Sequence, residues 1–312
     1  MNDTTTPPPV PAILGPTASG KSDLGIELAL RLNGEIINCD SVQVYQGIEI
    51  ATAKVPLAER RGVPHHLLDV VPPERNFTAM EWAAAAVQTI ADIEARGCTA
   101  LLVGGTGFYL RALRQPLFAS PPTDEKLRQR LAALRERRGP EHLHRMLQRL
   151  DAASAARLFP RDWPRVQRAL EVYWQTGRAM SAQMPQRPDA PECAARLRIF
   201  ALNPPRDALY ERINRRAAGH FAAGLVGEVK DLLVRGVPPE SNALGAHGYR
   251  RAVEYLRGAR TLESAIEQTQ TDVRHYAKRQ MTWLRREPGV VWLNGWGTDP
   301  TAAATVLQHL GQ

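Results

Sequence analysis

A complete phosphate-loop motif near the start of the chain limits the fold more than any other feature. Residues 15–22 match G-x-x-x-x-G-K-[ST] without a mismatch. The apolar run 12–14 precedes the motif and an amphipathic stretch at 23–32 follows it, so the motif joins a strand to a helix. In that setting, backbone N–H groups converge on an oxyanion at the helix N-terminus. We therefore expect a diphosphate or triphosphate to bind to Gly15, Thr17, Ala18, Ser19, Gly20, Lys21 and Ser22.

Two side chains of the motif carry specific chemistry. Lys21 would place a positive charge beside the phosphates, and the Ser22 hydroxyl suits a Mg²⁺ ligand. The same motif is the signature of nucleotide-binding and ATP-binding proteins. It predicts a bound phosphate chain and leaves open which group is transferred and to what.

Composition indicates an ordinary globular protein. The 312 residues are 44% apolar and 23% charged, and no apolar run approaches the roughly 18 residues that cross a bilayer. The cysteines Cys39, Cys98 and Cys193 are too widely spaced for a disulfide framework or a zinc site, which favours a reducing cytoplasm. We expect residues 1–10, rich in proline and threonine, to form a disordered leader.

The order of the predicted elements indicates an α/β fold. Strands predicted at 12–14, 35–39, 67–70 and 99–103 alternate with helical patterns, which is typical of a parallel sheet. Strand signals then disappear, and helices are predicted at 124–138, 140–150, 152–158 and 164–176. Strands return at 197–202 and 290–293, with helices between them. We therefore predict a P-loop NTPase-like parallel-sheet core formed by 11–117 and 197–312, interrupted by an all-α helical insertion at 118–196.

Basic residues are concentrated in two parts of the chain. The net charge is +8, and residues 111–178 hold 15 Lys and Arg against 7 Asp and Glu. A second basic cluster contains Arg274, Lys278, Arg279, Arg285 and Arg286. Clustered arginines on helices are expected in a protein that binds a phosphate-rich polymer, although a solvated helical face can have the same composition.

Polar residues follow two of the predicted strands, where ligands collect beyond the carboxyl ends of a parallel sheet. Asp40 comes directly after 35–39, which places a candidate base or metal ligand near the phosphate loop, although an Asx turn would also use this aspartate. Thr106 lies in the glycine-rich segment 104–107 after the next strand. A mechanical NTPase would end that strand with an acidic residue. Glycines and a hydroxyl instead favour a transferase whose backbone approaches its substrate closely.

Eight segments of the chain resemble the tRNA dimethylallyltransferase family, in order and with similar gaps from about residue 12 to residue 293. They are the phosphate loop 15–22, DSVQVY at 40–45, TAK at 52–54, PHHLLD at 64–69, LVGGT at 102–106, RALEV at 168–172, GYR at 248–250 and AKRQMTWL at 277–284. One departure is Ala51, where the family usually has glycine before Thr-Ala-Lys, and it removes no reactive group.

The resemblance implies the reaction and its participants. The donor would be dimethylallyl diphosphate, and the acceptor would be the exocyclic N6 of adenosine 37, beside the anticodon of a tRNA. Asp40 would take the N6 proton as a general base, and Thr106 would hydrogen-bond near the reacting atoms. The loop amides, Lys21, Arg216 and a Mg²⁺ held partly by Ser22 would stabilise the departing diphosphate. The adenine would flip out of its stack into a channel between the core and the insertion.

The resemblance also implies tRNA contacts in three regions of the chain. Near the phosphate loop these are Asp40, Ser41, Val42, Gln43 and Thr106. In the insertion they are Arg128, Pro164, Arg165, Val166, Gln167 and Arg168. In the C-terminal part they are Gly248, Tyr249, Arg250, Lys278, Arg279 and Gln280. The chain would act as a monomer in the cytoplasm, with the anticodon stem-loop as its partner.

Three other functions would use part of the same pattern. A prenyltransferase acting on free adenine nucleotides would share the phosphate loop and the early aspartate, but the basic segments favour a polymeric acceptor. A small-molecule or nucleoside kinase would add arginine-rich lid motifs, and the sequence contains no convincing one. A non-catalytic RNA-binding module would have no use for an intact phosphate loop.

Overall fold

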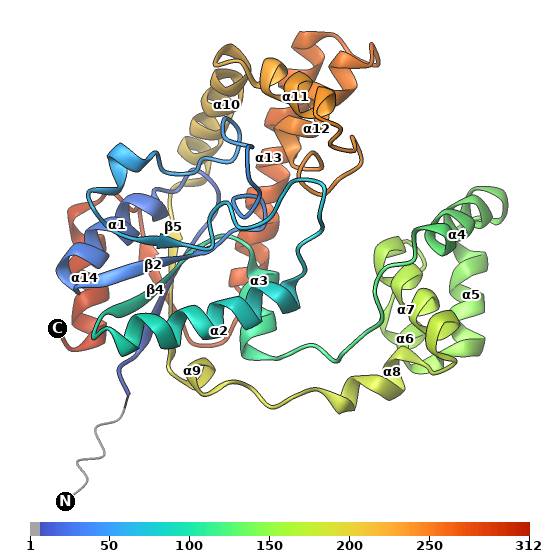
Figure 1. Cartoon of the computed structure of the whole chain (residues 1–312), viewed down its shortest axis with the longest axis horizontal. Helices are drawn as coiled ribbons and strands as arrows, with labels where there is room; N and C mark the ends of the chain where they lie inside the picture. Colours follow the sequence, from blue (N-terminus) through green and yellow to red (C-terminus); the bar gives the residue numbers. More distant parts are fainter. Residues whose placement is uncertain (1–6) are drawn as a thin grey trace, which may run out of the picture. The chain divides into compact units, whose positions relative to one another are not determined.

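The computed structural model describes residues 7–312, which divide into two compact units (Figure 1). The first unit contains the residues up to Arg114 together with Pro191–Gln312 and holds the sheet, and the second, Gln115–Ala190, contains only helices. The expected insertion 118–196 differs from the second unit at both ends. At the C-terminal end, the short helix α9 (Glu192–Ala195) packs on α3 (Gly107–Arg114) of the first unit. No helix within residues 7–312 is long and apolar enough to cross a membrane.

A six-stranded parallel sheet forms the centre of the first unit. Its strands are β1 (Val10–Leu14), β2 (Gly34–Cys39), β3 (His65–His66), β4 (Thr99–Gly104), β5 (Leu197–Asn203) and β6 (Val290–Asn294). Their order across the sheet is β3-β2-β4-β1-β5-β6, and every neighbouring pair is parallel. The predicted α/β fold with a parallel-sheet core is therefore confirmed.

The register of the sheet brings three strand ends to one level. Leu14 at the end of β1 and Cys39 at the end of β2 both pair with Gly104 at the end of β4. Since paired residues stand side by side, the segments that follow these three strands leave the sheet from the same edge. They are the phosphate loop, the segment that begins at Asp40 and the glycine-rich segment 104–107.

Helices cover the sheet. α1 (Lys21–Arg31) and α14 (Pro300–Leu310) share one buried apolar cluster with the strands, in which Leu28 and Val306 have no exposed surface. α2 (Ala79–Ala95) packs on β2, β4 and α3, and a capping box of Thr78 and Glu81 begins it. A short 3₁₀ helix, Leu57–Arg60, precedes β3.

Four further helices complete the first unit: α10 (Arg206–Ala222), α11 (Leu225–Val234), α12 (His247–Leu256) and α13 (Leu262–Leu284). Figure 1 shows the long helix α13 beside α10 and α12, which it contacts along its length. Ala277 of α13 shares a buried cluster with Leu209 and Ile213 of α10 and with Ala18 of the phosphate loop. The cluster brings both helices against that loop.

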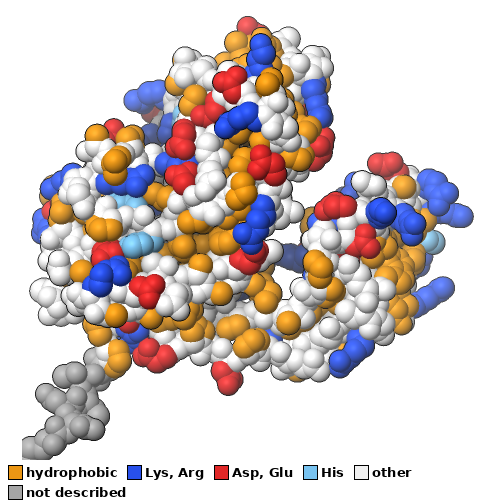
Figure 2. Space-filling model, in the orientation of Figure 1, with side chains coloured by type: hydrophobic (Ala, Val, Ile, Leu, Met, Phe, Trp, Pro, Cys, Tyr) orange, Lys and Arg blue, Asp and Glu red, His pale blue; other side chains and the backbone are white. Residues whose placement is uncertain are grey.

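The second unit is a helical domain with its own core. Its helices are α4 (Glu125–Arg138), α5 (Pro140–Leu150), α6 (Ala152–Arg157), α7 (Trp163–Thr176) and α8 (Met180–Gln183), followed by a 3₁₀ turn at Met184–Gln186. The four helices predicted for this region are confirmed. Leu143, Leu147 and Leu170 form the centre of its apolar cluster. Lys and Arg side chains lie along the surface of this unit (Figure 2).

Two expectations about the first unit are wrong. The strand expected at 67–70 lies instead at His65–His66, since Leu67 and Asp69 adopt left-handed φ angles of 59° and 54° that a strand does not contain. The Nδ2 of Asn38 donates to the Leu67 carbonyl oxygen at 3.0 Å and holds this turn. The leader expected at 1–10 is wrong at its last residue, because Val10 is buried and begins β1. Residues 1–6 lie outside the described part of the chain.

A buried carboxylate joins the helices of the second unit. The Glu171 side chain has no exposed surface, and it pairs with Arg128 at 3.2 Å and with Arg168 at 2.7 Å. It also accepts a hydrogen bond from the Asp124 N–H at 2.7 Å. Burial acts to raise the pKa of Glu171, but the hydrogen bonds from Arg168, Asp124 and Arg128 lower it below its ordinary value. Arg128 therefore joins α4 to α7, and Arg168, on α7 itself, ties Glu171 to the segment before α4 through hydrogen bonds to Ser120 and Pro121.

We expect Glu171→Ala to lower the free energy of unfolding of the second unit by about 3 kcal/mol, because the change leaves two cations and an N–H without their partner. Since the native pKa is lowered, this contribution is present above the ordinary glutamate pKa and is lost as pH falls through the native value. Denaturant titration at neutral and acidic pH measures both effects. The exposed Glu136→Ala on α4 is the matched control, and an equal effect of the two changes would contradict this role.

Candidate active site

The phosphate loop has the backbone geometry of an anion site. Ala18 and Gly20 adopt left-handed φ angles of 67° and 86°, and Gly20 is the N-cap from which α1 begins at Lys21. A Cβ at Gly20 would lie 3.1 Å from the nitrogen of Gly297, so both the conformation and the space require glycine. The helix start carries no capping side chain, which leaves its first N–H groups for a ligand. The strand–loop–helix arrangement predicted from the motif is confirmed.

Two half-buried cations lie at this loop. The Nζ of Lys21 donates to the Pro16 carbonyl oxygen at 3.4 Å, and Arg216 of α10 donates to the Thr17 hydroxyl. Burial lowers the pKa of Lys21 to about 8, an effect that Asp40 opposes and Arg216 reinforces. Burial also lowers the pKa of Arg216 to about 10. Because both groups are desolvated as cations, an anion bound at the loop would stabilise them.

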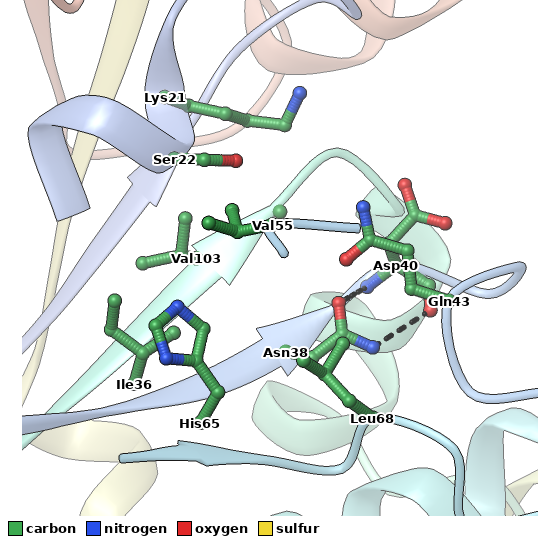
Figure 3. Close-up of a pocket in the computed structure, with 11 residues that line it drawn as sticks. Lys21, Ser22, Ile36, Asn38, Asp40, Gln43, Val55, His65, Leu68 and Val103 are labelled. Atoms are coloured by element: carbon green, nitrogen blue, oxygen red, sulfur yellow. Dashed lines mark hydrogen bonds between the residues drawn. The ribbon is translucent and has the colours of Figure 1, made fainter. Parts of the chain in front are cut away.

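Asp40 is held in a fixed turn at the carboxyl end of β2. Its N–H donates to Asn38 Oδ1 at 3.0 Å, and Asn38 Nδ2 donates back to the Asp40 carbonyl oxygen at 3.2 Å (Figure 3). One carboxylate oxygen, Oδ1, accepts from the Val42 N–H at 2.9 Å, so the Asx turn is present. Within the described residues the other oxygen, Oδ2, has no hydrogen bond and can accept a proton.

Lys21, Ser22 and Asp40 line one pocket, together with Ile36, Asn38, Gln43, Val55, His65, Leu68, Val103 and Gly104. Figure 3 shows the Lys21 and Ser22 side chains entering from α1 and those of Asp40 and Gln43 from the segment after β2. Aliphatic side chains form much of the wall between them. The pocket therefore suits a ligand with a charged head and an apolar part.

Thr106 is tied to the residue beside Asp40. The Thr106 N–H donates to the Cys39 carbonyl oxygen at 3.0 Å, and its hydroxyl accepts from the Ser41 N–H at 3.0 Å. Ser41 and Gln43 are half-buried, and the Gln43 amide donates to the Thr52 carbonyl oxygen at 3.0 Å. The expectation from the sequence that Thr106 and residues 40–43 lie together is therefore confirmed.

The glycines around Thr106 have a structural reason. A Cβ at Gly105 would lie 2.2 Å from Nε2 of Gln280, and one at Gly107 would lie 2.3 Å from the Trp283 ring. These glycines let the turn after β4 pack closely against α13. The expectation that the backbone here approaches the substrate closely stays a prediction.

Gln280 is inside the protein. Only 6% of the residue is exposed. Its Oε1 accepts from the Thr17 N–H at 2.9 Å, and its Nε2 donates to the Gly105 carbonyl oxygen at 2.9 Å. The expected tRNA contact is therefore corrected for this side chain, because other parts of the chain take its hydrogen bonds. Lys278 and Arg279 on the same turn are exposed.

The segment 248–250 also turns mostly inward. Tyr249 is fully buried, its hydroxyl donates to Glu228, and it accepts from the Ala51 N–H at 3.3 Å. A Cβ at Gly248 would lie 3.3 Å from that of Ala51, so close packing explains the glycine. The expected tRNA contact is corrected for the Tyr249 side chain and for buried Gly248, and Arg250 is the exposed member of the segment.

The expected contacts in the second unit divide in the same way. Pro164 and Arg165 are exposed at the start of α7, whereas Val166 has no exposed surface and belongs to the core. Gln167 is half-buried and donates to the Arg128 carbonyl oxygen at 3.3 Å. Because Val166 is a core residue, the expectation of a tRNA contact is corrected for its side chain.

The donor atoms of the pocket fit a Mg²⁺ ion only in part. Within residues 7–312 no group of three or more His, Cys, Asp or Glu side chains could hold a metal. The Ser22 hydroxyl and the Asp40 carboxylate line the same pocket. Mg²⁺ is usually held by one or two protein ligands together with substrate phosphates. The residues present therefore fit an ion bound jointly with a diphosphate.

Sequence reasoning missed two residues of the site. Asn38 is 3% exposed and fixes the backbone of Asp40, and a lone amide in the apolar run 35–39 was the available signal. Tyr276 of α13 lies beside Thr106, and its ring centroid is 5.3 Å from that of His247. An aromatic residue inside the second basic cluster was the signal there.

The lowered pKa of Lys21 predicts a pH-dependent affinity for a diphosphate ester. Binding requires the protonated ammonium, so we expect it to weaken as pH rises through about 8, where Lys21 loses its proton. Lys21→Arg keeps its charge over this range and should remove the dependence. Calorimetric titration with dimethylallyl diphosphate on both sides of that pH measures the effect. A wild-type affinity that stays constant would contradict the role of Lys21.

Comparison with known proteins identifies the family to which this chain is similar, independently of the site geometry. The family model described as IPP transferase matches residues 43–287. The tRNA dimethylallyltransferase of Solibacter usitatus is 48% identical and covers 97% of this chain and 100% of its own length, and that of Koribacter versatilis is 47% identical over 95% and 96%.

Solved structures agree with these relatives. The tRNA isopentenylpyrophosphate transferase of Bacillus halodurans is 37% identical with a TM-score of 0.69, and covers 98% of this chain and 95% of its own. A eukaryotic dimethylallyltransferase solved acting on tRNA is 29% identical with a TM-score of 0.76, over 97% of this chain and 79% of its own. The chain therefore belongs to the IPP transferase family and is a transferase of the tRNA dimethylallyltransferase type.

Proposed function

We propose that this enzyme transfers a dimethylallyl group from dimethylallyl diphosphate to N6 of adenosine 37 in the anticodon loop of tRNA and releases diphosphate. One observation carries the proposal: the phosphate-loop residues Lys21 and Ser22 line the same pocket as the carboxylate of Asp40. A phosphate site and a base then face a single reacting centre. The names of the curated relatives support the same transfer.

The donor's diphosphate would bind at the phosphate loop. The first N–H groups of α1 are uncapped, and Lys21 and Arg216 are half-buried cations beside the loop. Negative charge grows on the bridging and terminal oxygens as the allylic C–O bond breaks, so these fixed donors stabilise the transition state more than the ground state. Ser22 would hold a Mg²⁺ ion together with donor oxygens, and the ion would neutralise part of the leaving group's charge.

Asp40 would act as the general base. The N6 lone pair of adenine is delocalised into the ring, so N6 attacks well only if a base removes its proton as the new C–N bond forms. The Val42 N–H holds Oδ1 of Asp40 and leaves Oδ2 for that proton. Thr106, fixed through Ser41, would orient the amine or the bridging oxygen.

The acceptor would be a polymer. Adenosine 37 must leave its stack to reach the pocket, and unstacking costs a few kcal/mol that contacts to the surrounding RNA must offset. Arg250, Lys278 and Arg279 of the first unit are exposed, as is Arg165 of the second, and all can meet phosphates. We place the reaction in the cytoplasm, where tRNA is available, and propose a monomer.

A direct transfer assay tests this function. Labelled dimethylallyl diphosphate is incubated with the enzyme and either an anticodon stem-loop or AMP. We expect label in the stem-loop and little in AMP, because free AMP offers no surrounding RNA to offset the cost of desolvation and positioning. Equal labelling of the two acceptors would overturn the tRNA assignment.

Asp40→Asn should lower kcat by about 10²–10⁴ because it removes the base while keeping nearly the same shape. Affinity for the donor and for tRNA should stay within a few-fold. The exposed Asp92→Asn on α2 is the matched control and should leave kcat unchanged. Single-turnover kinetics give the comparison, and a variant with more than half of the wild-type rate would show that Asp40 is structural.

Arg165→Ala should weaken tRNA binding and lower the slope of log affinity against log salt by up to about 0.9, as expected for one lost phosphate contact. Its side chain is 74% exposed, so the change should not affect folding. Arg31→Ala, an exposed arginine on α1, is the control. An unchanged slope for Arg165→Ala would remove α7 from the tRNA-binding surface.

A further inference from the structure

The amide of Gln280 joins two loops that the proposed reaction uses. Its Oε1 accepts from the Thr17 N–H of the phosphate loop, and its Nε2 donates to the Gly105 carbonyl oxygen, both at 2.9 Å. Only 6% of the residue is exposed, and the side chain passes so close to Gly105 that a Cβ there would lie 2.2 Å from Nε2. The Gln280 side chain of α13 therefore lies between the loops that follow β1 and β4.

Both ends of this bridge continue toward reacting groups. Thr17 lies in the phosphate loop, and its hydroxyl accepts from Arg216. Gly105 precedes Thr106, whose hydroxyl accepts from the Ser41 N–H, next to Asp40. The chain of contacts thus runs from the diphosphate side of the pocket to the side of the general base.

The fold alone does not call for an amide at this position. Apolar contacts already anchor the same part of α13, since Ala277 packs on Leu209 and Ile213 and the ring of Trp283 packs over Gly107. A buried amide loses its hydration on folding, and its hydrogen bonds return little net stability beyond that loss. A hydrophobic side chain of similar size would fill the same space and keep α13 in place, although the Thr17 N–H and the Gly105 carbonyl oxygen would lose their partner.

We propose that Gln280 is a positioning residue that sets the phosphate loop at a fixed distance from the segment carrying Thr106 and Asp40. The inference rests on the proposed prenyl transfer. In this role Gln280 aligns the donor with the base, and its side chain makes no direct contact with tRNA. Misplacing reactive groups by about 1 Å can lower a rate by about 10²-fold, so this alignment matters for kcat.

The test compares Gln280→Met with wild type on an anticodon stem-loop. Methionine has a similar volume and makes neither hydrogen bond. We expect kcat to fall about 10- to 100-fold, while the stem-loop Kd stays close to wild type. The melting temperature should fall modestly, because the Thr17 N–H and the Gly105 carbonyl oxygen lose their partner. Gln270→Met is the matched control, because the Gln270 amide on the same helix donates to the Asn214 carbonyl oxygen at 3.2 Å, away from the pocket.

A second variant disturbs the same contact between Gln280 and Gly105 by changing the glycine. Gly105→Ala adds a Cβ that must displace the Gln280 amide, and its backbone conformation needs no glycine. We expect the same loss of kcat with tRNA affinity kept. This variant keeps the test decisive if Gln280→Met does not fold.

The outcomes separate the inference from the proposed function. A wild-type enzyme that does not label the stem-loop contradicts the proposed function itself. With an active wild type, a Gln280→Met enzyme of undiminished kcat overturns the positioning role. So does a variant whose only defect is weaker stem-loop binding, because that result would make Gln280 a tRNA contact.

Discussion

The level at which β1, β2 and β4 end is the constraint on which the site depends. Leu14, Cys39 and Gly104 stand in register, so the three segments that follow them begin side by side. A one-residue slip of β2 would turn Asp40 away from the phosphate loop. Backbone hydrogen bonds of the sheet, with apolar helices packed on it, therefore fix the distance between the phosphate loop and Asp40, the proposed base.

The charges around the phosphate loop are the second constraint on the site. Lys21 and Arg216 are cations that burial disfavours, as their lowered pKa values show, and Asp40 partly offsets this for both. The site therefore favours the binding of an anion, because an anion would stabilise both cations. In the proposed reaction, a donor diphosphate would bind there, and its charge would increase as the allylic bond breaks, so the arrangement would favour the transition state without reorganising.

The sequence predicts the parts of this site that depend on local pattern. The phosphate loop, its strand and helix, and the position of Asp40 after β2 all follow from residue types and spacing, and the structure has them. It cannot predict which polar side chains find partners inside the chain. Arg128 and Arg168 pair with a buried glutamate, Gln280 bridges two loops, and Tyr249 binds Glu228. Except for Arg168, which lies three residues before Glu171, these side chains find their partners at least 21 residues away. A basic or polar motif alone therefore does not distinguish a surface contact from an internal one.

The most direct test of the account is the position of the transferred group. An anticodon stem-loop is compared with one in which adenosine 37 is replaced by purine riboside, which lacks the exocyclic amine. After incubation with dimethylallyl diphosphate, both are digested to nucleosides and analysed by mass spectrometry. The account predicts one dimethylallyl group on adenosine 37 of the first RNA and none on the second. A dimethylallyl group on any other nucleoside, or on the substituted RNA, would contradict it.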